Sequence, residues 1–195
     1  MSRRAETEIK LVVPNLRALR RKLRELGFRV VRPRHFESNV LYDFPDLRLW
    51  KARSLLRLRQ AGREWFLTFK GAPFGSRTYK IRQEIEARVV DGSVVAEILE
   101  GLGLRPAFRY QKYRTVFAQI ARGRQKPCAL AELDETPIGS YLELEGPAAW
   151  IDRVAKQLGY SHDHYITASY ASLYREKCEE SGEPPTDMVF AGRKS

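Results

Sequence analysis

The chain has 195 residues, a length typical of one domain or a tight pair of lobes, with 43% hydrophobic and 30% charged residues. This composition excludes a disordered chain, because it supplies enough apolar side chains for a core. Lysine and arginine total 35 against 24 aspartates and glutamates, a formal net charge of +11. An excess of this size favours an anionic partner: a nucleic acid, an acidic membrane surface or a phosphorylated small molecule.

Cysteines, histidines and apolar runs exclude several further classes of protein. Cys128 and Cys178 form neither a disulfide framework nor a CxxC pair, and His35, His162 and His164 lack a zinc-type set of partners. No apolar run approaches the ~20 residues that span a bilayer, and the N-terminus "MSRRAETEIK" lacks the apolar core of a signal peptide. We therefore expect a cytoplasmic protein with no membrane partner and no zinc or thiolate site.

Period-two alternation, which is typical of strands, dominates the first half of the chain. It appears first in residues 6–13, "ETEIKLVV", and Pro14 and Asn15 then begin a helix with a leucine stripe that ends at Gly27. Strand-like segments follow at residues 28–33 and 38–44. Residues 54–60 and 64–70 are expected to form a hairpin around the turn "AGR".

In the second half of the chain, predicted helices sit between or after groups of strands rather than strictly alternating with them. Residues 79–89 and 107–120 are predicted strands, separated by a helix over residues 91–103. Residues 129–135 and 140–146 are predicted to form a hairpin around "TPIG", followed by helices at 147–159 and 166–178. The pattern predicts an α+β fold with a mainly antiparallel sheet of eight or nine strands. We expect one domain over residues 1–178 and a weakly ordered tail over 179–195.

Charged residues occupy the polar face of nearly every predicted strand. Period two places the members of each pair on one face, roughly 6.5–7 Å apart. For any single pair, a solvated sheet face is the simpler interpretation. The full set instead favours a barrel with a polar interior, in which acids and bases compensate each other. Such an interior suits a polyanion with a divalent cation, because arginine and lysine bind phosphate oxygens and carboxylates bind the metal.

The ordered motifs resemble those of the CYTH superfamily, which is named for class IV adenylate cyclase and thiamine triphosphatase and is also called the triphosphate tunnel metalloenzymes. The matching segments cover about residues 5–175 and are "ETEIK", "NVLYDFPD", "LLRLR", "FLTFKG", "RQEIEARV", "KYR", "AELDE" and "YLELEG". The resemblance implies a closed eight-stranded antiparallel β-barrel with flanking helices. It also implies a triphosphate-containing substrate held inside the barrel with Mg²⁺ or Mn²⁺.

Roles for individual residues follow from the same resemblance. The metal-facing acids would be Glu6, Glu8, Glu84, Glu86, Asp134, Glu143 and Glu145, with Glu132 pointing the same way. The cations that hold the triphosphate would be Lys10, Arg57, Arg59, Lys70, Arg82, Lys112 and Arg114. Of these, Lys10, Arg57, Arg59 and Lys70 are the candidate catalytic residues. Glu84 and Glu86 have an alternative structural role as ion-pair partners of the arginines. The chain departs from some relatives at Ala168, where they carry a lysine.

Three functions are compatible with this sequence. The leading hypothesis is a metal-dependent triphosphatase acting on inorganic triphosphate, a nucleoside triphosphate or thiamine triphosphate. The alternative is a class IV adenylate cyclase, which would use the same interior residues. The third is a non-catalytic polyphosphate- or nucleic-acid-binding module. Nucleic acid is not an expected partner, because binding it would place the cations on an open surface. A homodimer is compatible with the sequence.

Overall fold

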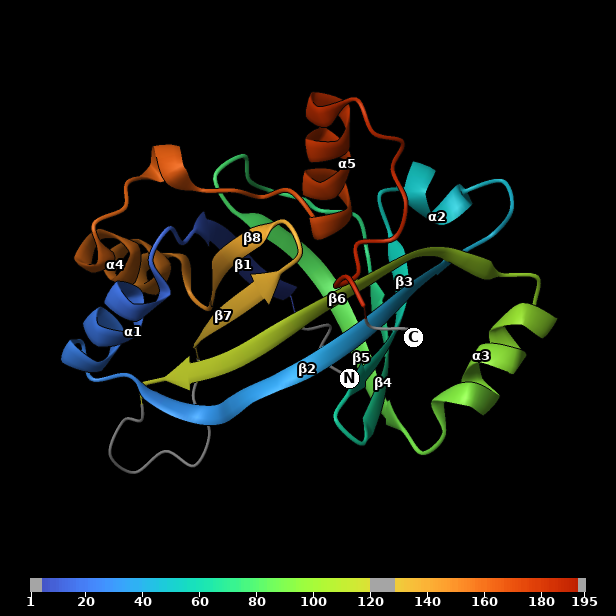
Figure 1. The fold of residues 1–195 in the computed structure, drawn as a ribbon, viewed down its shortest axis with the longest axis horizontal. Helices are drawn as coiled ribbons and strands as arrows, with labels where there is room; N and C mark the ends of the chain where they lie inside the picture. Colours follow the sequence, from blue (N-terminus) through green and yellow to red (C-terminus); the bar gives the residue numbers. More distant parts are fainter. Residues whose placement is uncertain (1–4, 120–128, 193–195) are drawn as a thin grey trace.

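Eight antiparallel strands close into one barrel in the computed structural model, which describes residues 5–119 and 129–192 (Figure 1). The order around the barrel is β1-β5-β4-β3-β2-β6-β7-β8. The strands are β1 (Ala5–Val12), β2 (Arg29–Asp43), β3 (Leu55–Ala61), β4 (Glu64–Lys70), β5 (Lys80–Val89), β6 (Arg105–Ala118), β7 (Leu130–Thr136) and β8 (Gly139–Glu145). The predicted closed eight-stranded barrel is therefore confirmed.

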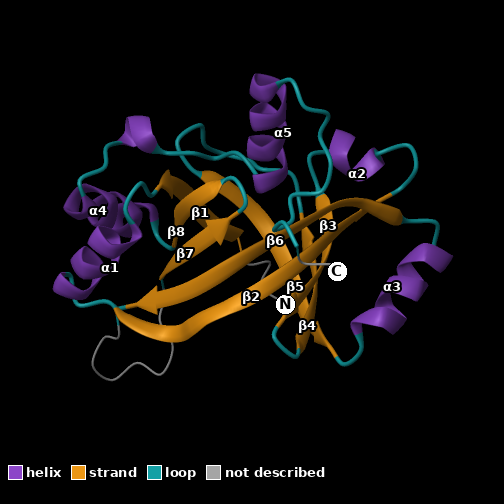
Figure 2. Cartoon of the chain, in the orientation of Figure 1, coloured by secondary structure: helices purple, strands orange, loops and turns teal. Residues whose placement is uncertain are grey.

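Helices lie on the outside of the barrel (Figure 2). They are α1 (Leu16–Glu25), α2 (Arg48–Lys51), α3 (Gly92–Gly101), α4 (Ala148–Leu158), α5 (Tyr170–Ser181) and a short 3₁₀ helix at His162–His164. Side chains of Asn15, Asp91 and Ser169 accept hydrogen bonds from the first free N–H groups of α1, α3 and α5. Helix α2 was not predicted, because four residues are too few to show helical periodicity. No helix in the described segments combines the length and the apolar character needed to cross a membrane.

The apolar half of the strand alternation faces outward, onto the helices. Leu19 and Leu23 of α1 and Ile151 of α4 pack with Ile9 and other outward residues of the barrel, all of them buried. A second apolar cluster fills the space between α3 and β3, and a third lies beneath α5. The hydrophobic core is thus a set of layers between helices and barrel wall. The polar half of each strand faces the barrel interior.

Strand β2 is longer than the sequence suggested. The two predicted segments at 28–33 and 38–44 join into one strand that runs through Pro33. The register between β2 and β6 shifts between Arg32 and His35, so the proline, which has no N–H to donate, falls at an irregularity. Because β2 and β6 are both long, they extend beyond the barrel towards α2 and α5 (Figure 1).

The C-terminal segment differs from the weakly ordered tail predicted for residues 179–195. Helix α5 continues to Ser181, and Met188 is 1% exposed. The Met188 N–H donates to the Arg109 carbonyl at 2.9 Å, and the Gln111 N–H donates to the Met188 carbonyl at 2.9 Å. The physical reason lies in β6, which pairs with β7 only from Tyr113 onward and leaves an open backbone edge before it. The segment near Met188 covers part of that edge.

A charged tunnel as candidate active site

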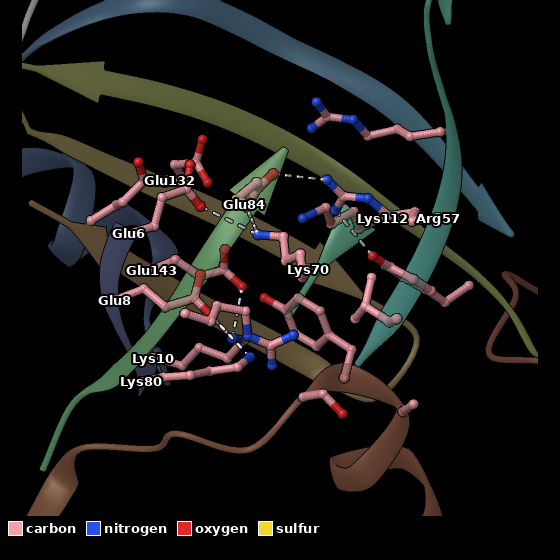
Figure 3. A pocket seen from close by; sticks show the side chains of 18 of the residues that line it. Glu6, Glu8, Lys10, Arg57, Lys70, Lys80, Glu84, Lys112, Glu132 and Glu143 are labelled. Carbon is pink, nitrogen blue, oxygen red and sulfur yellow. Dashed lines mark hydrogen bonds and ion pairs between the residues drawn. The ribbon is translucent and has the colours of Figure 1, made fainter. Parts of the chain in front are cut away.

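The barrel interior is a polar cavity of about 280 Å³, which we call the tunnel. Its lining comes from all eight strands and from residues 169–171 at the start of α5. Every predicted metal-facing acid except Asp134 lines the tunnel, and so does every predicted phosphate-binding cation. Figure 3 shows these side chains converging from opposite walls. The structure therefore brings together residues that lie up to 139 positions apart, from Glu6 to Glu145.

Strand register places opposite charges side by side across the tunnel wall. Glu8 of β1 lies opposite Lys80 of β5, and the Lys80 Nζ is 2.9 Å from the Glu8 Oε1. Lys10 lies opposite Glu143 of β8, with the Lys10 Nζ 3.2 Å from the Glu143 Oε1. Because antiparallel partners on one face are direct neighbours, the charge pattern of single strands becomes a network of ion pairs.

The arginines of β3 are held by acids from two other strands. The Arg59 Nη2 donates to both oxygens of Glu86 at 3.2 and 3.1 Å, and the Arg59 Nη1 lies 3.5 Å from Glu37. Arg57 reaches Glu86 at 3.4 Å and the hydroxyl of Thr68 at 3.2 Å. Glu86 thus acts as an ion-pair partner of both arginines in this structure. It lines the tunnel but has little free coordination capacity for a metal.

Asp134 stands on the interior face of β7 but is covered by other side chains and does not line the tunnel. It is 0% exposed, and it accepts hydrogen bonds from the Lys112 Nζ at 2.9 Å, the Arg114 Nε at 2.6 Å and the Tyr170 hydroxyl at 2.8 Å. Its oxygens are therefore occupied by two cations and a phenol. In this structure Asp134 therefore fixes the two cations and anchors the start of α5, and its metal-binding role stays a prediction.

The remaining acids divide into two electrostatic groups. Burial opposes ionisation of Glu8, but Lys10 and Lys80 outweigh it and hold the Glu8 pKa well below its usual range. Burial, a shared hydrogen bond with Glu84 and the nearby Glu145 raise the pKa of Glu6 to about 9. Burial and neighbouring carboxylates also raise the pKa of Glu145 to about 7. Glu6 and Glu145 therefore lie where negative charge exceeds the local supply of cations.

The carboxylates around Glu6 and Glu145 are suitable ligands for a divalent metal such as Mg²⁺. Carboxylate oxygens are the ligands that Mg²⁺ and Mn²⁺ prefer, and such an ion would relieve the crowding of Glu6, Glu84 and Glu145. Within residues 5–119 and 129–192, no three acidic, histidine or cysteine side chains are already close enough to form a preassembled metal site. A metal ion here would therefore require these carboxylates to move closer together.

Arg82 is the exception among the tunnel cations. It is 6% exposed, yet within the described residues its guanidinium has neither an ion pair nor a hydrogen bond, and its Nε is buried without a partner. Burial, together with the nearby Arg57 and Arg53, lowers the Arg82 pKa in spite of Glu8 and Glu84. A buried and unpaired charge is costly. An anionic ligand that contacted Arg82 would therefore supply the counter-ion that this side chain lacks.

A second cavity of about 860 Å³ adjoins the tunnel and shares Lys80 and Arg82 with it. We call this cavity the vestibule. Its walls come from α2, α5 and the extended ends of β2 and β6, and they carry the aromatic residues Trp50, Phe108 and Tyr174. Further lining cations are Lys51, Arg53 and Arg175.

The vestibule wall is built around Asp43. This buried carboxylate accepts hydrogen bonds from the N–H groups of Phe44, Leu49 and Trp50 at 2.7, 3.0 and 2.9 Å. These bonds fix α2 and hold Trp50 at the cavity, where its side chain is 57% exposed. The Arg175 guanidinium of α5 lies 5.5 Å from the Trp50 ring, so the two walls meet across a cation–π contact. The vestibule therefore offers an aromatic surface and positive charge.

Three residues of the site were absent from the sequence prediction. Lys80 shares the face of Arg82 by period two, which was a usable signal. Glu37 is 1% exposed and contacts Lys112 at 3.6 Å, but the predicted strand began one residue too late to include it. Tyr170 lines the tunnel next to Lys10, whose Nζ lies 5.3 Å from the ring centroid. No strand periodicity could indicate Tyr170, because it stands at a helix start.

Fold and site together define a class: a closed eight-stranded barrel whose interior is a network of paired acids and bases. The chain belongs to the CYTH family, whose domain model matches residues 4–170. A relative from Methanocaldococcus jannaschii, named as a candidate adenylate cyclase, is 26% identical over 179 residues, which cover 86% of this chain and 97% of the relative.

Solved structures share the fold. A candidate adenylate cyclase from Vibrio parahaemolyticus has a TM-score of 0.75 at 19% identity, covering 88% of this chain and 98% of its own. A Pyrococcus horikoshii protein has a TM-score of 0.73 at 24% identity, covering 88% and 99%. A Hippeastrum candidate adenylyl cyclase, described as having a dominant triphosphatase activity, has a TM-score of 0.63 at 20% identity, covering 92% and 97%. At these identities the likeness concerns the fold alone.

Proposed function

We propose that the protein is a divalent-metal-dependent triphosphatase that hydrolyses an organic triphosphate inside the tunnel. The observation that carries the proposal is the coexistence, in one cavity, of eight cations with seven carboxylates, of which Glu6 and Glu145 have raised pKa values because of burial and the negative charge that crowds around them. A phosphate-only binder gains nothing from carboxylates, which would repel its ligand. A metal-assisted triphosphatase needs both groups, because phosphoryl transfer is mostly positioning and electrostatic stabilisation.

The cations would hold the triphosphate and neutralise charge that develops during transfer. Lys10, Arg57, Arg59 and Lys70 point into the tunnel from three different strands, so they can contact phosphate oxygens from several sides. Each of these cations is ion-paired with a carboxylate in this structure: Lys10 with Glu143, Arg57 and Arg59 with Glu86, and Lys70 with Glu84. An arriving triphosphate would compete for these cations. The released carboxylates would become free to move, which would couple substrate binding to metal binding.

Glu6, Glu8, Glu84 and Glu145 would hold the metal, with Glu143 close to Lys10 at their margin. When bound, Mg²⁺ or Mn²⁺ supplies charge neutralisation of the phosphate oxygens and orientation of the attacking group. Asp134 would act indirectly, by keeping Lys112 and Arg114 in position. Lys10, Lys112 and Arg114 are buried, and burial strengthens electrostatic interactions of this kind.

The vestibule supports an organic triphosphate rather than inorganic triphosphate. The tunnel, at about 280 Å³, suits the phosphates, whereas the vestibule, at about 860 Å³, adds aromatic surface beyond them. Arg82 lines both cavities, so it can hold the phosphate nearest the organic group. Ligand sites commonly combine apolar and aromatic walls with a few well-placed charges in this way. A nucleoside or thiamine triphosphate has the aromatic group that this arrangement requires.

Class IV adenylate cyclase activity is the second candidate. The vestibule could hold the adenosine of ATP, and the relative from M. jannaschii is named as a candidate adenylate cyclase. The two reactions differ in the nucleophile. Water gives hydrolysis, whereas the ribose 3′-hydroxyl attacking the α-phosphorus gives cyclic AMP and pyrophosphate.

Product analysis tests the proposal. The protein would be incubated with ATP, thiamine triphosphate or inorganic triphosphate, each with Mg²⁺, with Mn²⁺ or with EDTA. We expect metal-dependent release of orthophosphate, with a higher kcat/KM for an organic triphosphate than for inorganic triphosphate. If the products were cyclic AMP and pyrophosphate, the proposed triphosphatase activity would be rejected in favour of an adenylate cyclase activity. Absence of turnover with retained triphosphate binding would support a binding module instead.

Trp50→Ala tests the vestibule. We expect the KM for the preferred organic triphosphate to rise about three- to tenfold, because an aromatic contact contributes about 0.5–1.5 kcal/mol. The KM for inorganic triphosphate should stay unchanged, since that substrate does not reach Trp50. Phe74→Ala is the control, because Phe74 is 55% exposed and lines neither cavity. An equal change in KM for both substrates would contradict a role for Trp50 in holding the organic group.

A further inference from the structure

The net charge of +11 does not reside in the tunnel. The tunnel and the buried acids that pair with it hold eight cations and nine carboxylates, which nearly cancel. These are Lys10, Arg57, Arg59, Lys70, Lys80, Arg82, Lys112 and Arg114 against Glu6, Glu8, Glu37, Glu84, Glu86, Glu132, Asp134, Glu143 and Glu145. The proposed triphosphatase activity therefore leaves the basic character of the chain unexplained, and the excess cations must lie outside this network.

One continuous stretch of sequence holds most of the excess. Residues 17–34 contain eight cations and a single acid, Glu25, so this stretch accounts for seven of the eleven excess charges. Seven of the eight cations are arginines. In the fold, the stretch comprises α1, the following turn and the first part of β2.

Helix α1 separates its apolar and cationic residues. Leu19 and Leu23 are buried against the barrel and α4. Arg17, Arg21 and Arg24 follow the i, i+4, i+7 spacing, which places them in one stripe about 10 Å long. All three are exposed, and the Arg21 side chain is 71% accessible. Burial of the leucines fixes the orientation of α1, so the three arginines face the solvent.

Strand β2 continues this cationic surface. Arg20 of α1 and Arg34 of β2 both contact Glu135, at 3.4 and 3.0 Å, so the two elements present one surface. The Arg34 guanidinium also lies 3.5 Å above the ring of Tyr113, which adds an aromatic group. We define the basic face as Arg17, Arg20, Arg21, Arg24 and Arg34. None of these residues lines the tunnel or the vestibule.

The basic face lies apart from the substrate entrance. Figure 1 places α1 and the beginning of β2 at one side of the molecule, whereas α5 lies near the middle and α2 towards the other side; α2 and α5 border the vestibule. A ligand on the basic face would therefore leave the vestibule open. Binding at this face and turnover in the tunnel can occur at the same time.

We propose that the basic face binds the phosphodiester backbone of a nucleic acid without reading its sequence. An exposed stripe of arginines extending onto a neighbouring strand matches a repeating line of phosphates, and guanidinium groups bind phosphate in a bidentate manner. Insertion into a membrane is disfavoured, because the leucines of α1 are already buried in the core.

Binding of a fluorescein-labelled RNA, measured by anisotropy over about 50–200 mM salt, tests this inference. Arg17→Gln with Arg24→Gln should weaken binding about tenfold or more and reduce the slope of log K against log salt by about 2. The matched control is Arg77→Gln with Lys177→Gln, which removes the same charge from exposed positions elsewhere. Neither pair lines the tunnel, so both variants should keep the triphosphate turnover of the wild type.

Several results would overturn the proposal. If both double variants weakened RNA binding equally, overall charge would be responsible and the basic face would have no special role. If inorganic triphosphate displaced the RNA at constant ionic strength, the RNA would be bound at the tunnel. Absence of RNA binding at the lowest salt, or stronger binding to anionic lipid vesicles than to RNA, would also reject a nucleic-acid partner. Because none of these readouts requires catalysis, failure here is distinguishable from failure of the proposed triphosphatase.

Discussion

Replacement of Glu6 and Glu8 together by glutamine is expected to reduce metal-dependent turnover about 100- to 1,000-fold. Losing two carboxylate ligands removes the charge that would hold the metal, and a single electrostatic contributor to a transition state is commonly worth that factor. The fold should survive the change. Burial and neighbouring acids raise the Glu6 pKa to about 9, so without metal this side chain is already neutral near pH 7 and glutamine resembles it. Glutamine at position 8 keeps an oxygen that can accept from Lys80.

Turnover and stability would be measured on the same preparations. The control is Glu97→Gln with Glu100→Gln, which makes the same charge change on the exposed side of α3 and should leave turnover unchanged. Titration with Mn²⁺ should show at least tenfold weaker metal binding in the Glu6 and Glu8 variant alone. Full activity of that variant, with the wild-type metal requirement, would show that the acids of β1 do not hold the metal.

Most of the fold could be predicted because the strands carry two independent periodic signals. Leucine and isoleucine at alternate positions pack under the helices, and the intervening charges face the tunnel, so a single alternation specifies both surfaces. Caps such as Asn15 and Asp91 then located helix starts within one or two residues. The failures were α2 and the segment around Met188. Neither has a period, and both depend on partners distant in sequence: the carboxylate of Asp43 and the open edge of β6.

The sequence predicted most of the residues that face the barrel interior. It did not predict how deeply each one is buried or which ion pairs it forms. Parity along a strand places Arg82, Glu84 and Asp134 on interior faces, and the first two do line the tunnel. Parity cannot tell which side chain will find a counter-ion. Arg82 has no ion-pair partner among residues 5–119 and 129–192, whereas Asp134 is enclosed by two cations and the Tyr170 hydroxyl. Those outcomes depend on barrel closure, on strand register and on the start of α5, which bring together groups far apart in the chain.

The composition also carried a signal that the barrel alone does not explain. A net charge of +11 initially favoured an anionic partner, and the tunnel supplied an apparent answer. Because the cations inside the barrel are balanced by carboxylates, the net positive charge of the chain lies on its outer surface. Net charge is therefore informative about partners only after the buried pairs have been subtracted. In this chain most of the remaining positive charge lies on α1 and the first part of β2.

Replacement of Asp134 by alanine is expected to lower the free energy of unfolding by about 3–5 kcal/mol. The change would leave Lys112 and Arg114 buried beside fewer negative charges, and removing one partner of a buried ion pair typically has this cost. The Tyr170 hydroxyl would also lose its acceptor, which would loosen the start of α5. Urea unfolding in EDTA would measure the effect without any contribution from metal binding.

The neighbouring Glu135→Ala is the matched control, because residue 135 stands on the opposite face of β7. Glu135 contacts Arg20 and Arg34 with 23% of its side chain exposed, so its loss should cost about 1 kcal/mol or less. Asp134→Asn should fall between the two, since it keeps hydrogen-bonding capacity but loses the charge. A decrease of under about 1 kcal/mol for Asp134→Ala would contradict the positioning role. If that variant instead unfolded normally in EDTA but bound Mn²⁺ poorly, Asp134 would be a metal ligand after all, reached by a rearrangement of Lys112 and Arg114.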